Sequence, residues 1–391
     1  MNKLNDEVKS ELTDHILPFW MKLEDKENGG IYGTVNHELA VTKEASKGGI
    51  ITSRFLWTYS AAARILKNDD YLKFADRLFR FLGNNLIDKE QQGIYWMVDY
   101  KGNPVDTRKH VYAQSFAIYA LSEYYRASGN ENALQMAKEL FYLVETKGFD
   151  PVTNAYKEEF DREWNEIPNE MLSENGVMAD ITMNTTIHVL EAYTTLFKAW
   201  PSDDVKRSLE NLLHILYEKI YDRETKYLGV FFDKNWKSLL NLKSFGHDIE
   251  ASWLIDEALK ALGNENSEYI QMVKDIAYNI ASYAIQKDGS LINEEENGHQ
   301  DLTRVWWVQA EAMVGFLNAY ERTKDKKFLG LVENLWSYTK TNIIDSRENG
   351  EWHWSVDPDG KPSKKNIGDP WKGSYHNGRF CLEIIERMIE K

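Results

Sequence analysis

The chain has 391 residues, enough to bury a large core, and a formal net charge of −15 at pH 7. This acidic balance argues against a nucleic-acid partner and against anionic membrane surfaces, because both are negatively charged themselves. Cys381 is the single cysteine and no apolar run reaches membrane-spanning length, so the sequence predicts a cytoplasmic protein, without an internal disulfide, that binds a neutral small molecule.

Most of the chain is predicted to form helices, because apolar residues recur at intervals of three and four. In chain order the predicted helices are residues 55–66, 71–82, 111–126, 133–143, 184–199, 205–220, 249–262, 269–285, 305–320, 328–339 and 377–389. No stretch rich in proline or serine divides them, so we expect a single domain over residues 1–391.

A glycine-centred turn followed by aromatic or apolar residues recurs between the predicted helices. In chain order its copies centre on Gly30, Gly93, a degenerate copy at Ala155, Gly229, Gly289 and Gly350, at spacings of 63, 62, 74, 60 and 61 residues. A period of this length that holds two helices is typical of arrays built from one unit. Six units predict an all-α fold, a closed (α/α)6 barrel with short β-hairpins or turns at one end. An open solenoid is the alternative.

Several polar residues lie where a purely structural helix would be apolar. Arg54 lies in the aromatic stretch 53–57, and Asn184 and His188 are four residues apart on one helix face. His376 stands at the start of the last predicted helix. Each residue alone has a structural explanation, as an ion-pair partner, a satisfied core histidine or a helix cap. In a closed barrel, however, these helix starts converge on one central cleft.

Residues 244–253 contain the most informative pair. Ser244 is a candidate N-cap, and His247 and Glu250 are three residues apart, so they share a helix face. The positive end of the helix dipole disfavours a further positive charge on His247, and a neutral imidazole is what a general base needs. A partly buried histidine paired with its neighbour is the structural alternative.

Motifs for metals and nucleotide cofactors are missing from the sequence. It has no His-Glu-x-x-His, no paired cysteines and no glycine-rich phosphate loop, so the sequence gives little support for a metal site and none for a nucleotide cofactor. Neutral histidines with an arginine and carboxylates suit removal of a proton next to a carbonyl group. Two bases are useful when the proton leaves one face of a carbon and returns to the other, which is an epimerisation.

Together the motifs resemble the cellobiose 2-epimerases of the N-acylglucosamine 2-epimerase superfamily over nearly the whole chain. The segments that carry the resemblance are residues 53–57, 109–112, 172–176, 183–188, 246–253, 306–311 and 375–379. The resemblance implies an (α/α)6 barrel. It also implies reversible inversion at C2 of the reducing-end glucose or mannose of β-1,4-linked disaccharides such as cellobiose and lactose, without a cofactor.

The resemblance further implies roles for single residues. His247 and His376 would be the acid–base pair, while Arg54, His188 and Glu250 would surround the reacting end of the open-chain sugar. The residues expected to bind the substrate are Tyr112, Phe116, Asn184, Trp306, Trp307 and Trp371. Trp371 is the candidate platform for the second sugar, and we expect a monomer or a weak homo-oligomer.

Other functions remain open from the sequence. An (α/α)6 glycoside hydrolase would need two opposed carboxylates, whereas the polar cluster is rich in histidine. An aldose–ketose isomerase would share the enediolate and reprotonate C1, and a monosaccharide or N-acylglucosamine 2-epimerase would share the C2 chemistry. A sugar-binding barrel without catalysis would not need two histidines at helix starts beside an arginine.

Overall fold

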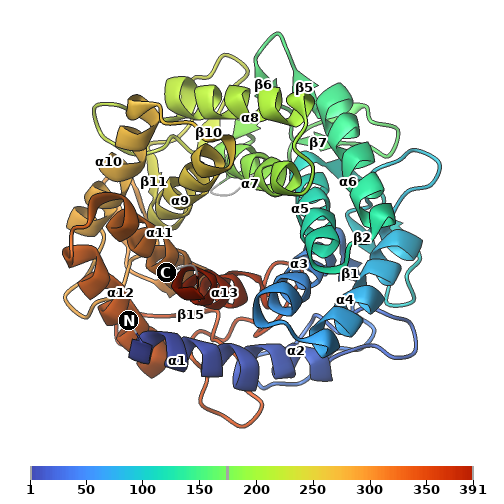
Figure 1. Ribbon diagram of the computed structural model, residues 1–391, viewed down its shortest axis with the longest axis horizontal. Coiled ribbons are helices and arrows are strands. Elements are labelled where there is room, and N and C mark those ends of the chain that lie inside the picture. The colour runs from blue at the N-terminus through green and yellow to red at the C-terminus, as the bar shows by residue number, and fades with distance from the viewer. Residues whose placement is uncertain (1, 173–175, 390–391) are drawn as a thin grey trace.

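An inner ring of helices closes on itself in the computed structural model, which describes residues 2–172 and 176–389 (Figure 1). The inner helices are α3 (Gly49–Leu66), α5 (Val111–Ser128), α7 (Met183–Ala199), α9 (Phe245–Leu262), α11 (Trp306–Thr323) and α13 (Tyr375–Ile389). Each contacts the next along the chain and α13 contacts α3, so the ring is closed. Within the described ranges, no helix combines the length and apolar character needed to cross a bilayer.

A second layer of helices surrounds this ring. Five of its members are α4 (Asp69–Phe81), α6 (Glu131–Leu143), α8 (Asp203–Ile215), α10 (Ser267–Tyr283) and α12 (Lys327–Tyr338). Short π-helical segments extend four of them: η2 (Leu82–Leu86), η3 (Val144–Gly148), η4 (Leu216–Ile220) and η5 (Thr339–Ile343). The sixth outer position is filled by α1 (Asn2–Ser10), η1 (Glu11–Ile16) and α2 (Leu17–Lys22), which come from the other end of the chain. Contacts of α1 and η1 with α13 complete the sixth pair.

The sequence pattern was wrong in two respects. It predicted no helix over residues 2–22, because buried apolar residues there recur only about once per turn among charged ones. Helix α3 also begins earlier than predicted, at Gly49, because glycine and polar residues interrupt the apolar period of its first turns, whereas α9 begins at Phe245, directly after the predicted N-cap Ser244. These early turns carry most of the candidate site.

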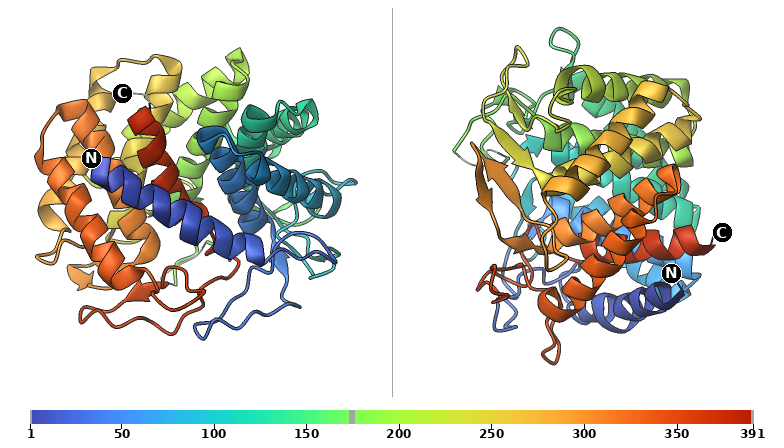
Figure 2. Two further views of the ribbon diagram at one scale, coloured as in Figure 1. Left: turned by 60° about the horizontal axis from the view of Figure 1, so that its bottom comes forward. Right: turned by 90° about the vertical axis from the view of Figure 1, so that its left-hand side faces the viewer.

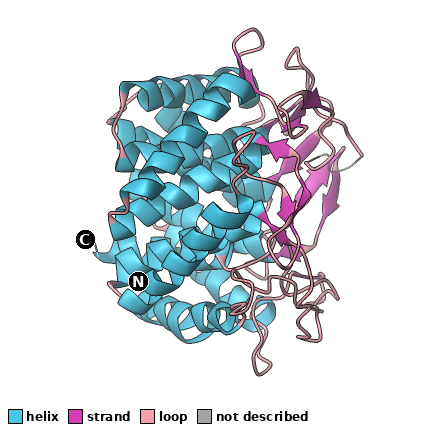
Figure 3. Cartoon of the chain, turned by 90° about the vertical axis from the view of Figure 1, so that its right-hand side faces the viewer, coloured by secondary structure: helices cyan, strands magenta, loops and turns pink. Residues whose placement is uncertain are grey.

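Short antiparallel strands gather at one end of the barrel, and both termini lie toward the other end (Figures 2 and 3). The strands are β1 (Lys47–Gly48), β2 (Met97–Val98), β3 (Pro104–Asp106), β4 (Lys109–His110), β5 (Phe149–Asp150), β6 (Ala155–Tyr156), β7 (Glu159–Phe160), β8 (Glu166–Ile167), β9 (Ile181–Thr182), β10 (Phe231–Phe232), β11 (Leu242–Ser244), β12 (Glu294–Glu296), β13 (His299–Asp301), β14 (Arg304–Val305) and β15 (Ser355–Val356). They form the sheets β1-β2-β3, β4-β7-β8 and β11-β12-β13 and the pairs β5-β6, β9-β10 and β14-β15. Strands β1, β4, β9, β11 and β14 run directly into inner helices, so strand pairing places the first turns of those helices.

An aspartate closes the turn after each outer helix. Its carboxylate accepts hydrogen bonds from backbone N–H groups two or three residues later, as in an Asx turn. These aspartates are Asp25, Asp88, Asp150, Asp222, Asp288 and Asp345. Gly30, Gly93 and Gly289 follow in left-handed conformations, with φ of 75°, 74° and 86°, which favour glycine. The sixfold repeat in the sequence therefore corresponds to one turn structure that recurs after every outer helix.

Replacing Asp88 by alanine is expected to lower the free energy of unfolding by about 3–5 kcal/mol. The buried carboxylate of Asp88 lies 3.0 Å from the buried ammonium of Lys109, so its removal leaves a buried charge without its partner. Denaturant unfolding measures the effect. Lys73→Met, which removes an exposed pair with Asp70, is the matched control and should change stability little. Equal effects of the two substitutions would contradict the expectation.

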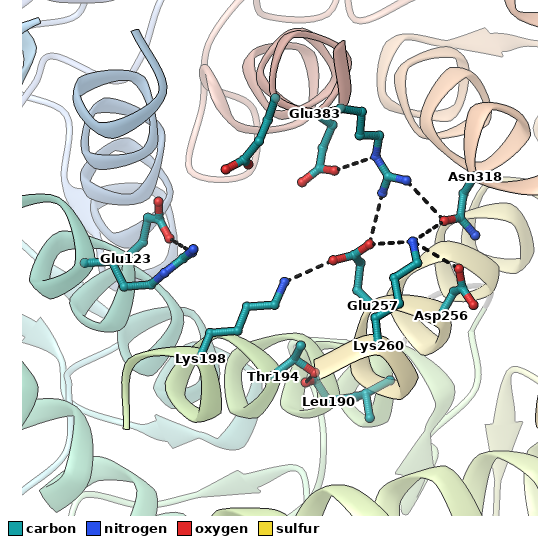
Figure 4. Close-up of polar contacts among 12 residues, drawn as sticks. Glu123, Leu190, Thr194, Lys198, Asp256, Glu257, Lys260, Asn318 and Glu383 are labelled. Atoms are coloured by element: carbon teal, nitrogen blue, oxygen red, sulfur yellow. Dashed lines mark hydrogen bonds and ion pairs between the residues drawn. The ribbon is translucent and has the colours of Figure 1, made fainter. Parts of the chain in front are cut away.

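The mouth of the barrel opposite the strands is lined by charged side chains at the ends of the inner helices. Each inner helix carries a basic residue in its last turn: Arg64, Arg126, Lys198, Lys260, Arg322 and Arg387. These cations stand at the negative ends of the helix dipoles and pair with carboxylates, as Lys198 does with Glu257 at 3.0 Å (Figure 4). A cavity of about 480 Å³ lies at this mouth, and all of these basic residues except Arg322 line it.

Candidate active site

At the strand end of the barrel, the first turns of the inner helices surround a cavity of about 290 Å³. Arg54, His188, His247, Glu250 and His376 all line it, although they come from the first to the last inner helix. Their expected convergence on one cleft is confirmed, while their catalytic roles stay predictions.

His247 lies in the first turn of α9. Its Nδ1 is 2.7 Å from the hydroxyl of Ser244, which occupies the N-cap position but makes no capping hydrogen bond. The ring packs against Trp307 with ring centres 4.7 Å apart, and Gly246 permits this, because a Cβ there would lie 2.7 Å from the tryptophan ring. Burial, with a contribution from His188, lowers the pKa of His247 to about 3. His247 is therefore a neutral base at neutral pH.

His376 lies in the first turn of α13. Its Nδ1 is 2.7 Å from Oε1 of Glu311, so Nε2 is the nitrogen available to a substrate. Trp307 also packs against this ring, with ring centres 5.6 Å apart, and thus contacts both histidines. Burial, together with the positive charges of Arg54 and Arg379, lowers the pKa of His376 below its ordinary value. Both histidines are therefore predominantly neutral at neutral pH.

His188 lies in the second turn of α7, and a carboxylate and two aromatic rings hold its side chain in place. Its Nδ1 is 2.8 Å from Oε2 of Glu191, and its ring packs against Tyr112 and Phe116 at 5.0 and 4.9 Å between ring centres. Tyr112 lines the cavity. Phe116, which we expected to bind the substrate, is instead buried behind His188 and Tyr112 and does not line the cavity. Its position in the second turn of α5 directs its ring into the packing between helices.

Arg54 reaches from α3 along the cavity wall. Its Nη1 donates to the carbonyl oxygen of Trp371 at 2.5 Å, and its Nη2 donates to the hydroxyl of Tyr112 at 2.9 Å. The guanidinium also lies over the ring of Phe116, 4.5 Å from its centre. A buried cation held in this way is suited to stabilise a negative charge that develops on a substrate oxygen.

Glu250 lines the cavity, Glu311 lies behind it, and both pair with the guanidinium of Arg379. Burial raises the pKa of each to about 7, and their mutual repulsion adds to the shift of Glu250. Glu250, Glu311 and His376 offer ligand atoms within 4.8 Å of one another, a spacing that a metal ion could use. Arg379 already supplies a cation to both carboxylates, and the expected absence of a metal stays a prediction.

Comparison with known proteins shows the family to which the chain belongs. Residues 30–378 match the family model described as N-acylglucosamine 2-epimerase (GlcNAc 2-epimerase). The chain belongs to the N-acylglucosamine 2-epimerase family. The solved structure of cellobiose 2-epimerase from Bacillus thermoamylovorans B4167 is 60% identical, covers 99% of this chain and 100% of that chain, and has a TM-score of 0.98. Cellobiose 2-epimerases from Ruminococcus albus and Dictyoglomus turgidum are 47% and 44% identical over 98% of this chain and 99% of their own lengths.

Membership of the N-acylglucosamine 2-epimerase family makes the chain a carbohydrate epimerase, and the similar solved structure confirms the predicted (α/α)6 barrel. Aromatic rings form much of the wall of its cavity. Of the residues expected to bind substrate, Tyr112, Asn184, Trp306, Trp307 and Trp371 line it. Trp306 is buried and packs on Trp354 at 4.5 Å between ring centres, whereas Trp307 is partly exposed. Trp307 is therefore the more accessible of the two adjacent tryptophans.

Sequence reasoning missed part of this epimerase cavity. The further lining residues are Leu172, Val230, Phe231, Leu242, Ser244, Asn293, Glu294, Val305, Trp354 and Lys365. Most come from loops and very short strands, which have no periodicity to reveal them. Of the motif at residues 172–176, residues 173–175 lie outside the described part of the chain.

Three charged residues behind the cavity had no predicted role in the site: Glu191, Glu311 and Arg379, of which the last two end the segments 306–311 and 375–379 that carry the resemblance. All three are buried on inner helices. A signal for them was present in the sequence, because a charged residue on a helix face that is otherwise apolar is rare unless it is paired.

Proposed function

We propose that this protein catalyses the reversible epimerisation at C2 of the reducing-end glucose or mannose of β-1,4-linked disaccharides such as cellobiose and lactose. The observation that carries the proposal is the placement of His247 and His376 in one cavity, with both rings against Trp307 and beside Arg54. Two neutral bases on separate helices suit removal of a proton from one face of a carbon and its return to the other. Proteins named cellobiose 2-epimerase align with nearly the whole chain.

The proposed reaction begins with opening of the sugar ring, for which His376 is the candidate acid–base group. The open-chain aldehyde acidifies the C2 proton, because the carbonyl group delocalises the resulting negative charge. One of His247 and His376 removes this proton, Arg54 stabilises the enediolate oxygen, and the other histidine returns a proton to the opposite face. His188 and Glu250 would bind hydroxyl groups of the open chain, and Trp371 would carry the second sugar.

Several further properties belong to the proposal. The reaction would need neither a metal nor an organic cofactor, since the histidines and Arg54 supply the base, the acid and the cation. The barrel over residues 1–391 would work as one domain, as a monomer or weak homo-oligomer. Its net charge of −15 disfavours nucleic acids and anionic membranes as partners. Cys381, buried and without a disulfide, suits the reducing cytoplasm.

Incubation of the protein with cellobiose in deuterium oxide, followed by NMR, tests the proposal. We expect a product with mannose at the reducing end and deuterium at C2, because the returning proton comes from a group that exchanges with solvent. Heat-denatured protein is the control. A ketose product alone would replace the proposal with an aldose–ketose isomerase, free glucose would indicate a hydrolase, and unchanged, unlabelled cellobiose would leave only sugar binding.

A further inference from the structure

Behind the cavity, the guanidinium of Arg379 is enclosed by three carboxylates from three other inner helices. It pairs with Glu191 of α7, Glu250 of α9 and Glu311 of α11, the last at 2.7 Å. All four side chains are buried, and none has more than 4% of its surface exposed. The hydroxyl of Tyr375 completes this group with hydrogen bonds to Arg379 and Glu191.

The charges in this cluster do not balance if every carboxyl group is ionised. Arg379 opposes three carboxylates, and even if His188, which pairs with Glu191, contributes a second positive charge, one negative charge would remain uncompensated among buried groups. Such burial is costly. Glu191 is the best compensated of the three. Burial alone would raise its pKa, but Arg379 and His188 outweigh burial and lower it. A proton in the cluster therefore resides on Glu250 or Glu311, whose pKa values are raised to about 7.

Glu311 of this cluster is linked to the cavity through His376. Oε1 of Glu311 is 2.7 Å from Nδ1 of His376, and Oε2 accepts a hydrogen bond from the indole of Trp253 at 3.1 Å. An imidazole has two nitrogens on opposite sides of its ring, so it can receive a proton on Nδ1 while it gives one up from Nε2. If Glu311 were ionised and had no proton to give, a neutral His376 could accept a proton from carbon but would have little capacity to return one.

We propose that Arg379, Glu191, Glu250 and Glu311 form a buried proton store, and that Glu311 passes its proton through His376 to C2 of the substrate. This proposal rests on the proposed epimerisation and assigns Glu311 as a positioning residue that acts through His376. Arg379 holds the three carboxylates together, so that one proton is retained among them.

The proton transfers balance over the reaction. His247 takes the C2 proton, and the electron pair of that bond moves into the enediolate. The electron pair then returns to C2, which takes the Nε2 proton of His376 on its other face, while the proton of Glu311 moves to Nδ1. The cycle leaves His247 protonated and Glu311 ionised. Reaction of the other epimer reverses every transfer, and exchange of protons with solvent restores the starting form.

The substitution Glu311→Gln tests the relay, since an amide retains a hydrogen bond to Nδ1 of His376 but supplies no acidic proton. In deuterium oxide we expect inversion at C2 to fall by about 100-fold or more. Exchange of the C2 proton without inversion should persist for one of the two epimers, because His247 can remove the proton and return deuterium to the same face. Glu321→Gln is the matched control, since Glu321 is on the same helix but pairs with Arg387 at the opposite mouth.

Infrared spectroscopy provides a second measurement. Its result for the wild-type protein tests the proposal even if a variant fails to fold. Between about pH 6 and about pH 8 we expect loss of the C=O band of a neutral carboxyl group. Burial also raises the pKa of Asp248 and raises the pKa of Glu158 to about 8, so these groups contribute to the same band. The band should therefore be weaker in Glu311→Gln than in the wild type, and unchanged in Glu321→Gln. A wild-type protein without the band, or a Glu311→Gln variant whose band is as strong as that of the wild type, would overturn the proton store.

The two proposals fail in different ways. If the wild-type protein does not invert C2 of cellobiose, the proposed function is wrong. If the wild-type protein inverts C2 and Glu311→Gln keeps the wild-type ratio of inversion to exchange, the epimerase stands and the proton store is wrong.

Discussion

Replacement of His247 by asparagine is expected to lower kcat for C2 epimerisation by about 10²–10⁴-fold, for cellobiose and for its mannose-ended epimer alike. Asparagine keeps a polar side chain of similar volume within reach of Ser244, but it has no titratable ring. The pKa of His247 near 3 means that the wild-type base is already neutral at neutral pH, so the variant loses the base itself. Sugar binding should change little, because Trp307 and Trp371 remain in the cavity.

Steady-state kinetics of both epimers, together with calorimetric binding of cellobiose, measure this effect. His299→Asn is the matched control, because His299 is exposed on β13 at the same end of the barrel. A His247→Asn variant that inverts C2 at a rate near that of the wild type would remove His247 from the mechanism.

Replacement of Arg54 by methionine is expected to lower kcat by about 10²–10³-fold. The negative charge of the enediolate appears only as the C2 proton leaves, so a cation fixed beside the carbonyl oxygen stabilises the transition state more than the bound aldehyde. Arg54 is fixed in this way by its hydrogen bonds to Trp371 and Tyr112. Methionine retains much of the volume of the side chain and removes its charge.

Separate determination of kcat and KM distinguishes this role from simple binding. Arg54→Lys should recover part of the loss, because it keeps the charge without the planar geometry of the guanidinium. Arg223→Met, which removes a half-exposed arginine from a surface pair with Glu218, should leave kcat unchanged. A higher KM with an unchanged kcat in Arg54→Met would show that Arg54 binds substrate and transition state equally.

Much of the fold could be predicted because its signals are local. Apolar periodicity revealed most of the helices, and the turn repeated from Gly30 to Gly350 revealed the sixfold repeat. The number of units and the polar residues beside helix ends favoured closure of the ring over an open solenoid. The helical segment over residues 2–22 was missed because its apolar residues recur only about once per turn, and its contacts with α13, at the other end of the chain, have no local signal.

The same distinction applies to the candidate site, where some features are local in the sequence and others depend on the tertiary structure. The sequence by itself determined which reactive side chains lie at the starts of inner helices, because His247 and Glu250 or Asn184 and His188 are related by helical spacing alone. Only the tertiary structure decided that Phe116 lies behind the cavity and that Arg379 joins carboxylates from three other helices. Burial and charge pairing depend on neighbours brought together by closure of the ring, and these neighbours set the protonation of His247 and Glu311.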